Sequence, residues 1–206
     1  MNPEGINFFE PIIVVGPGRC GTSLVAGVLH HLGVFMGAEF VSANESNPDG
    51  YWEDRSFRDL NQSVLSKKIT AHQWDLKIDQ LIKERRALQV PWGWKDPRTC
   101  HLLNKYRSHL NNPFFIRCRR NPDAIEKSML KAYAGIGWTL ETARSCRQWR
   151  ESRLDEFLQS HNSLEIEFEL LIKNSKNSVA KMIDYLSLPG ITKEKFFNSI
   201  QFIRRD

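Results

Sequence analysis

The stretch Ile12-Ile-Val-Val-Gly-Pro-Gly-Arg-Cys-Gly-Thr-Ser23 decides the fold. Its short apolar run, which suits a buried strand, leads straight into a turn with three glycines. A helical pattern follows at once, because apolar residues recur at helical spacing from Leu24 to Leu32. A glycine-rich turn between a strand and a helix exposes backbone N–H groups at the positive end of the helix dipole. The stretch therefore predicts a loop that binds a phosphate or another anion.

The loop departs from a nucleoside-triphosphate loop at one position. It nearly matches the pattern G-x-x-x-x-G-K-[ST], but Thr22 stands where that pattern has lysine. An ATPase or a kinase uses that lysine to reach the β and γ phosphates, and the cation of this loop is instead Arg19. The residues expected to bind the anion are Gly16, Pro17, Gly18, Arg19, Cys20, Gly21, Thr22 and Ser23.

Three further apolar runs read as strands, at residues 92–95, 114–117 and 164–168. Helical patterns lie between them, around Phe57 to Leu65, Ile125 to Tyr133 and Cys146 to Leu158, and a last one runs from Val179 to Leu186. Alternating strands and helices predict an α/β fold of three layers, with a central parallel sheet flanked by helices. No repeat or linker divides the chain, so residues 1–206 are predicted to form a single domain.

A second anion site is predicted after the third strand. Asn121 suits the N-cap of a helix, and Pro122 suits its first position. The early N–H groups of that helix favour an anion, and Arg120 supplies a planar fork of donors for phosphate oxygens. In parallel sheets ligands bind at the carboxyl ends of the strands, where both of these motifs lie.

Together the two motifs resemble those of the sulfotransferase family. The loop is similar to the family's 5′-phosphosulfate loop, which has a basic residue and then Gly-Thr-Thr or Gly-Thr-Ser. The segment from Arg120 to Ser128 has the Arg-x-Pro pattern and the serine eight residues after the arginine that the family shows. The resemblance implies the P-loop NTPase-like sulfotransferase fold. It also implies sulfuryl transfer from 3′-phosphoadenosine 5′-phosphosulfate (PAPS) to a hydroxyl or an amine, with 3′-phosphoadenosine 5′-phosphate (PAP) as the product.

The same resemblance assigns roles to residues. Arg19 would hold the phosphosulfate and stabilise the leaving oxygen, Thr22 and Ser23 would hold the 5′-phosphate, and Arg120 with Ser128 would grip the 3′-phosphate. The two phosphate anchors, together with the lack of a metal cluster or an activated nucleophile in the sequence, predict direct in-line transfer with no metal and no covalent enzyme intermediate. The late segment Glu165-Ile-Glu-Phe-Glu-Leu-Leu171 resembles a family strand, with phenylalanine in place of the usual tyrosine, and supports the fold only.

The acceptor side offers candidates for the catalytic residues. Asn47-Pro-Asp-Gly-Tyr-Trp-Glu-Asp54 resembles a segment of bacterial-type sulfotransferases, and Glu53 is the first choice for the base that takes the acceptor proton. Glu39 and His72 are its rivals. Lys95 and Arg98, in a second segment of that resemblance, would hold the sulfate or an acidic acceptor, or Lys95 would pair structurally with the neighbouring Asp96.

Composition sets the remaining expectations. The net charge of +5 favours an anionic partner, but no nucleic-acid motif is present, and no segment is apolar for long enough to span a membrane. Met1 to Pro11 lack the pattern of a secretory signal, and four scattered cysteines suit reduced thiols, so the chain is predicted to be cytoplasmic. The acceptor would be a small molecule, a carbohydrate or a lipid. A P-loop kinase and a non-catalytic PAP-binding module are the alternatives.

Overall fold

Four parallel strands form the centre of the molecule, in the spatial order β2-β1-β3-β4. The computed structural model describes residues 10–44, 47 and 50–204. The segment Met1 to Pro11, in which the sequence shows no secretory signal, falls almost entirely outside these ranges. The strands are β1 (Ile12–Val15), β2 (Gly93–Lys95), β3 (Phe114–Arg119) and β4 (Ser163–Glu167).

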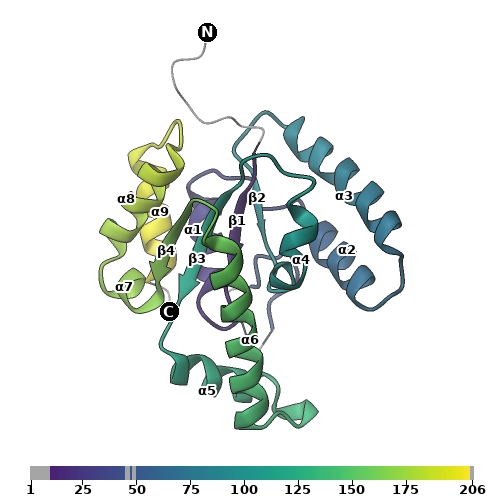
Figure 1. Ribbon diagram of the computed structural model, residues 1–206. Coiled ribbons are helices and arrows are strands. Elements are labelled where there is room, and N and C mark those ends of the chain that lie inside the picture. Colours follow the sequence, from purple (N-terminus) through teal and green to yellow (C-terminus); the bar gives the residue numbers. More distant parts are fainter. Residues whose placement is uncertain (1–9, 45–46, 48–49, 205–206) are drawn as a thin grey trace.

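Helices connect the strands and cover both faces of the sheet (Figure 1). In chain order they are α1 (Thr22–His31), α2 (Arg55–Leu65), α3 (Ala71–Arg86), α4 (Thr99–Tyr106), α5 (Pro122–Ala132), the 3₁₀ helix η1 (Ala134–Ile136), α6 (Leu140–Leu158), α7 (Phe168–Lys173), α8 (Ser175–Leu186) and α9 (Lys193–Ile203). None of the helices in the described ranges is both long and apolar enough to cross a membrane.

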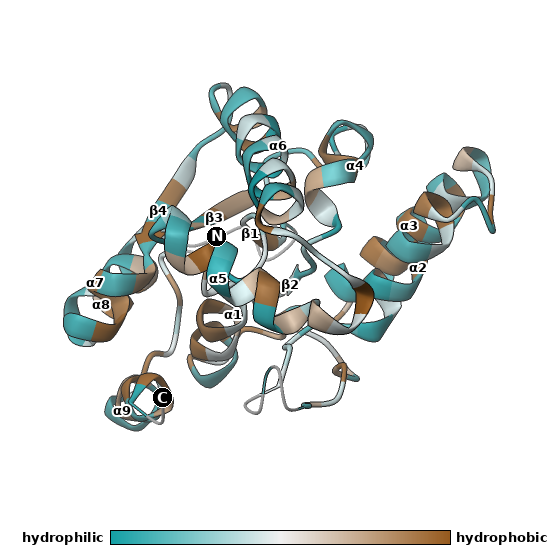
Figure 2. Cartoon of the chain, turned by 90° about the horizontal axis from the view of Figure 1, so that it is seen from below, coloured by the Kyte–Doolittle hydropathy of each residue, from teal (hydrophilic) through white to brown (hydrophobic). Residues whose placement is uncertain are grey.

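The pleat of β1 divides the core into two layers. Ile12 and Val14 pack against α1, α8 and α9, whereas Ile13 and Val15 pack against α3, α4 and α6. Successive side chains of a strand point to opposite faces, so a wholly apolar strand needs a helical layer on each side. In the view along the sheet, α2, α3, α4 and α6 lie on one side and α1, α7, α8 and α9 on the other (Figure 2). The three-layer α/β fold predicted from the sequence is therefore confirmed.

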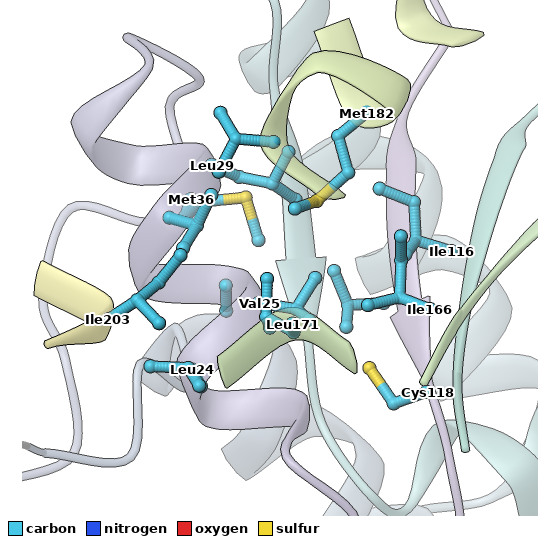
Figure 3. Close-up of a cluster of buried hydrophobic side chains, with 14 of the residues drawn as sticks. Leu24, Val25, Leu29, Met36, Ile116, Cys118, Ile166, Leu171, Met182 and Ile203 are labelled. Atoms are coloured by element: carbon cyan, nitrogen blue, oxygen red, sulfur yellow. The ribbon is translucent and has the colours of Figure 1, made fainter. Parts of the chain in front are cut away.

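One layer of the core joins the helix after the anion loop to the sheet. Figure 3 shows Val25 and Leu29 of α1 facing Ile116 of β3, Ile166 of β4 and Met182 of α8. All five side chains are buried. Because α1 is packed on this cluster, the position of its first turn is fixed relative to the ends of the strands.

Aromatic side chains are concentrated in the other layer. The rings of Phe57 and Trp94 stack with their centroids 4.3 Å apart and their planes 5° apart, and Trp74 meets Tyr106 edge to face. Stacked aromatic pairs add to the free energy gained by burial. Phe57 lies on α2 and Trp94 on β2, so this stack holds the start of α2 beside the end of β2.

The element boundaries match the sequence predictions at most positions. Asn121 caps α5 by accepting a hydrogen bond from the Ala124 N–H, with Pro122 in the first turn, as expected. Phe168 was expected to end the last strand, but it begins α7, because β4 already ends at Glu167. The sequence patterns do not predict α3, α4 or α9, and α9 packs against α1.

Gly93 has no room for a side chain. A Cβ atom at this position would lie 2.0 Å from the Ile12 carbonyl oxygen, a backbone atom that cannot turn away. We expect Gly93→Ala to lower the free energy of unfolding by about 1–3 kcal/mol, because β1 and β2 must move apart. Urea denaturation would measure the change. Gly135→Ala is the matched control, since nothing lies within 4 Å of its added Cβ; an equal loss in both variants would contradict the clash.

Candidate functional site

The anion loop joins the carboxyl end of β1 to the first turn of α1. Gly21 is the N-cap of α1 in a left-handed conformation with φ of 93°, and it makes no side-chain cap. A Cβ at Gly21 would lie 2.4 Å from the Phe168 ring, so only glycine fits there. Since a helix leaves its first N–H groups without partners inside the helix, this end of α1 presents donors and a positive dipole.

Arg19 links the loop to the second predicted motif. Its Nε donates a hydrogen bond to the Ser128 hydroxyl at 3.0 Å, and its carbonyl oxygen accepts one from Arg120 Nη1, also at 3.0 Å. Arg19 has φ of 59°, a left-handed conformation that is uncommon outside glycine. Trp52, beside the same cavity, has φ of 51°. Such strained residues cluster at functional sites, where the surrounding structure holds them.

A cavity of about 210 Å³ lies between these two motifs. Arg19, Arg120 and Ser128 contribute to its polar wall, and Phe168 belongs to its apolar wall. The Arg120 guanidinium stacks over the Phe168 ring at 4.2 Å, and Arg120 Nε is buried with no hydrogen-bond partner among the described residues. An anionic ligand could satisfy a buried donor of this kind.

A second cavity, of about 660 Å³, shares Arg19, Thr22 and Ser23 with the first. Glu53 and Lys95 line it, and both are buried. Lys95 Nζ lies 2.8 Å from Glu53 Oε1. The loop therefore forms a common wall between a small cavity with Arg120 and Ser128 and a larger one with a carboxylate and an amine.

Further polar groups lie next to the ion pair of Glu53 and Lys95. Arg98 Nη1 lies 3.6 Å from Glu53 Oε2 and 2.9 Å from Asp96 Oδ1. Asp96 also accepts a hydrogen bond from the Asn61 amide at 2.9 Å, and the Tyr106 hydroxyl donates to Asn61 Oδ1 at 2.8 Å. Burial, and then the charge of Asp96, raise the pKa of Tyr106 well above its usual value, so that its hydroxyl stays a donor.

The structure brings most of the sequence candidates together. Those that line one or both cavities are Gly18, Arg19, Gly21, Thr22, Ser23, Glu53, Lys95, Arg120 and Ser128. Gly16, Pro17 and Cys20 line neither cavity: the Pro17 carbonyl accepts a hydrogen bond from Arg150 at 2.7 Å, and the Cys20 side chain is fully buried.

The three candidates for the base differ in position. Glu53 lines the larger cavity, next to the loop. Glu39 and His72 are exposed and line neither cavity, and His72 lies in the first turn of α3. The geometry thus separates Glu53 from its two rivals.

The structure adds residues that the sequence reading did not place in the site. The sequence assigns Phe168 to the fold only, yet its ring packs on Gly21 and under Arg120. Arg150, on α6, reaches the loop from a distance of 133 residues in sequence. Asn47 donates to the Ser23 hydroxyl at 3.3 Å and to the Gly50 carbonyl at 2.6 Å. Pro48 and Asp49 of that segment lie outside the described residues.

A family model matches most of the chain. The model of the family described as the sulfotransferase family matches residues 11–193. No curated protein matches the chain at a significant level. Among the described residues, no group of three or more His, Cys, Asp or Glu side chains is arranged to hold a metal ion.

Solved structures share the fold at low sequence identity. The sulfotransferase domain of the Synechococcus PCC 7002 olefin synthase is 16% identical with a TM-score of 0.64, covering 97% of this chain and 80% of that one. Sulfotransferase STF9 from Mycobacterium avium is 9% identical with a TM-score of 0.60, covering 95% and 68%. Mouse sulfotransferase SULT7A1 in complex with PAP is 13% identical with a TM-score of 0.53, covering 95% and 65%.

The loop cysteine is a packing residue. Burial raises the pKa of Cys20 to about 11 and that of Cys100 to about 12, and it raises the pKa of Cys118 well above its usual value. A thiol below its pKa is protonated and a poor nucleophile. At pH 8 we therefore expect Ellman's reagent to modify at most Cys146, the half-buried cysteine, in the native protein. All four thiols should react in denaturant. Fast native reaction in a Cys146→Ser variant would contradict this assignment.

Proposed function

Because the chain belongs to the sulfotransferase family, we propose that it transfers a sulfuryl group from PAPS to a hydroxyl or an amine of a small acceptor. One observation carries the proposal: Arg19 hydrogen-bonds to Ser128 and is itself held by Arg120, which joins two anion sites around one cavity. A nucleotide with phosphates at both its 5′ and 3′ positions needs two such sites at a fixed separation. A nucleotide with a single phosphate chain needs one.

The residues fit a doubly phosphorylated nucleotide. The N–H groups and hydroxyls at Thr22 and Ser23 would hold the 5′-phosphate at the start of α1. Arg120 and Ser128 would hold the 3′-phosphate, which would also give the buried Arg120 Nε its missing partner. Gly21, with no Cβ, leaves space for the Phe168 ring, over which the Arg120 guanidinium stacks.

The larger cavity would hold the acceptor. Glu53 would take the proton from the acceptor hydroxyl or amine, as its oxygen or nitrogen bonds to sulfur and the bond from sulfur to the 5′-phosphate oxygen breaks. The nucleotide supplies the sulfuryl group and leaves as PAP. Lys95, 2.8 Å from Glu53, would orient the carboxylate and offer positive charge near the sulfuryl oxygens, while Arg19 would stabilise the charge on the leaving oxygen.

Two alternatives differ from this function in measurable ways. A P-loop kinase would need the lysine that Thr22 replaces, and it would bind ATP with Mg²⁺. A non-catalytic module would bind PAP through the same residues and turn nothing over. The four free cysteines fit a reducing compartment, which supports a place in the cytoplasm.

Nucleotide selectivity tests the proposal. At about 100 times its dissociation constant, PAP should raise the melting temperature by about 5–10 °C, whereas adenosine 5′-phosphate and ATP with Mg²⁺ at equal concentration should not. Arg120→Ala should weaken PAP binding by tenfold or more, because a charge-assisted contact to the 3′-phosphate is lost. Isothermal titration of PAP and of adenosine 5′-phosphate into the wild type and the variant would measure this change in affinity.

Arg119→Ala is the matched control, since Arg119 pairs with Glu165 at 2.8 Å and lines neither cavity. It should bind PAP like the wild type. Stabilisation by ATP with Mg²⁺ alone would favour the kinase. Unchanged discrimination between PAP and adenosine 5′-phosphate in Arg120→Ala would remove the proposed 3′-phosphate site.

The role of Glu53 makes a separate prediction. Glu53→Gln should lower kcat by about 10²–10⁴-fold, since glutamine can accept the Lys95 hydrogen bond but cannot take a proton. Its affinity for PAP should change by less than about twofold, because Glu53 does not line the smaller cavity. The measurement is PAP release from PAPS with a panel of hydroxylated acceptors. Glu39→Gln is the control and should keep full activity. The reverse pattern would move the role of base to Glu39. Full activity in both variants would leave His72 as the candidate for the base.

A further inference from the structure

The larger cavity carries an excess of positive charge. Among the described residues, its lining includes five cationic side chains and one carboxylate, that of Glu53. The cations are Arg19, Arg58, Lys95, Arg98 and Arg150. We propose that the acceptor carries an acidic group, a carboxylate or a phosphate, which Arg58 binds. This proposal rests on the proposed function, because it takes the larger cavity as the acceptor site.

Two of the five cations already form ion pairs with carboxylates of the protein. Lys95 pairs with Glu53 at 2.8 Å, and Arg98 pairs with Asp96 at 2.9 Å. Asp96 and Lys95 are both almost completely buried, so these pairs are weakly screened by solvent. Neither Lys95 nor Arg98 therefore requires an anion from the ligand.

Two more cations of this cavity lie at the loop that would hold the phosphosulfate end of the donor. Arg19 lies within the loop, and Arg150 Nη1 donates to the Pro17 carbonyl of that loop. The phosphosulfate of the donor carries one negative charge on its phosphate and one on its sulfate. Arg19 and Arg150 would balance these two charges, so the donor would leave Arg58 without an anionic partner among the described residues that line the cavity.

Arg58 forms one ion pair among the described residues, and this ion pair is weak. Its Nη1 lies 2.8 Å from Asp59, whose side chain is 61% exposed and does not line the cavity. An exposed pair of this kind contributes little, because water screens it. Arg58 Nε is buried and has no hydrogen-bond partner among those residues. The guanidinium thus keeps donors for a ligand in the cavity.

The position of Arg58 on α2 suits an acceptor. Arg58 and Gln62 are one turn apart and both line the cavity, and Gln62 accepts a hydrogen bond from Arg98 at 2.8 Å. Glu53 comes just before Asp54, the N-cap of the same helix. One helix therefore presents the proposed base near its start and a cation one turn further along. An acceptor bound here would place its hydroxyl at Glu53 and its acidic group at Arg58.

The guanidinium fork matches the two oxygens of a carboxylate or a phosphate. Matched pairs of small molecules distinguish these sources of charge. They are 4-hydroxyphenylacetate with its amide, 3-hydroxybutyrate with its amide, and glycerol 3-phosphate with glycerol. Each would be titrated into protein saturated with PAP, and PAP affinity would be measured first on its own.

In at least one pair, the acid should bind about tenfold more tightly than its neutral partner. Arg58→Gln should remove that preference, and PAP affinity should stay within about twofold of the wild type because Arg58 does not line the smaller cavity. Arg55→Gln is the matched control: Arg55 is an exposed arginine of the same helix that lines neither cavity, and this variant should keep the preference.

Normal PAP binding with no preference for any acid would overturn the inference and leave the proposed function standing. A preference for acids that persists in Arg58→Gln would also overturn the role of Arg58. Failure of the wild type to bind PAP would instead overturn the proposed function, and the inference with it. The wild type could prefer the phosphate alone or the carboxylates alone. If Arg58→Gln loses that preference, the result would support the inference and identify the acidic group.

Discussion

The carbonyl oxygen of Arg19 accepts a hydrogen bond from Arg120, 101 residues further along the chain, and the Arg19 side chain donates to Ser128. These two contacts tie the end of β1 to the segment that follows β3, its neighbour in the sheet. Arg19 can stay in its left-handed conformation because both its backbone and its side chain are held from the second segment. The two cavities and their common wall depend on this link, and so does the proposed placement of a separate phosphate at each motif.

Much of this arrangement could be read from local sequence. The glycines between a strand and a helix identify the loop from Gly16 to Ser23, and Asn121 with Pro122 marks the start of α5. Parallel strands place their carboxyl ends at one edge, so the two motifs were expected to lie close together. The family follows from the same residues, and the match over residues 11–193 confirms it.

What the sequence could not provide depends on contacts between distant elements. Arg150 lies on the long helix α6, where its spacing resembles that of any surface arginine, and only the packing of α6 brings it to Pro17. Phe168 has no local signal either; its role comes from the space beside Gly21 that it fills. Glu53 and Lys95 were each candidates, but 42 residues separate them, and no pattern of charges predicted that they would pair. The helix α3 was not predicted, although Trp74, Ile78, Leu81 and Ile82 are its buried residues.

The buried polar cluster of Glu53, Lys95, Asp96 and Asn61 also bears on how such a chain evolves. Removing charges from water costs free energy, and replacing a buried ion pair by apolar residues of similar volume is often neutral or stabilising by about 1–4 kcal/mol. Selection for stability alone would therefore tend to erase these side chains. Because these buried polar residues lie beside the aromatic layer of the core, mutants selected for heat resistance would drift toward an apolar core here, and would lose the proposed chemistry before they lost the fold.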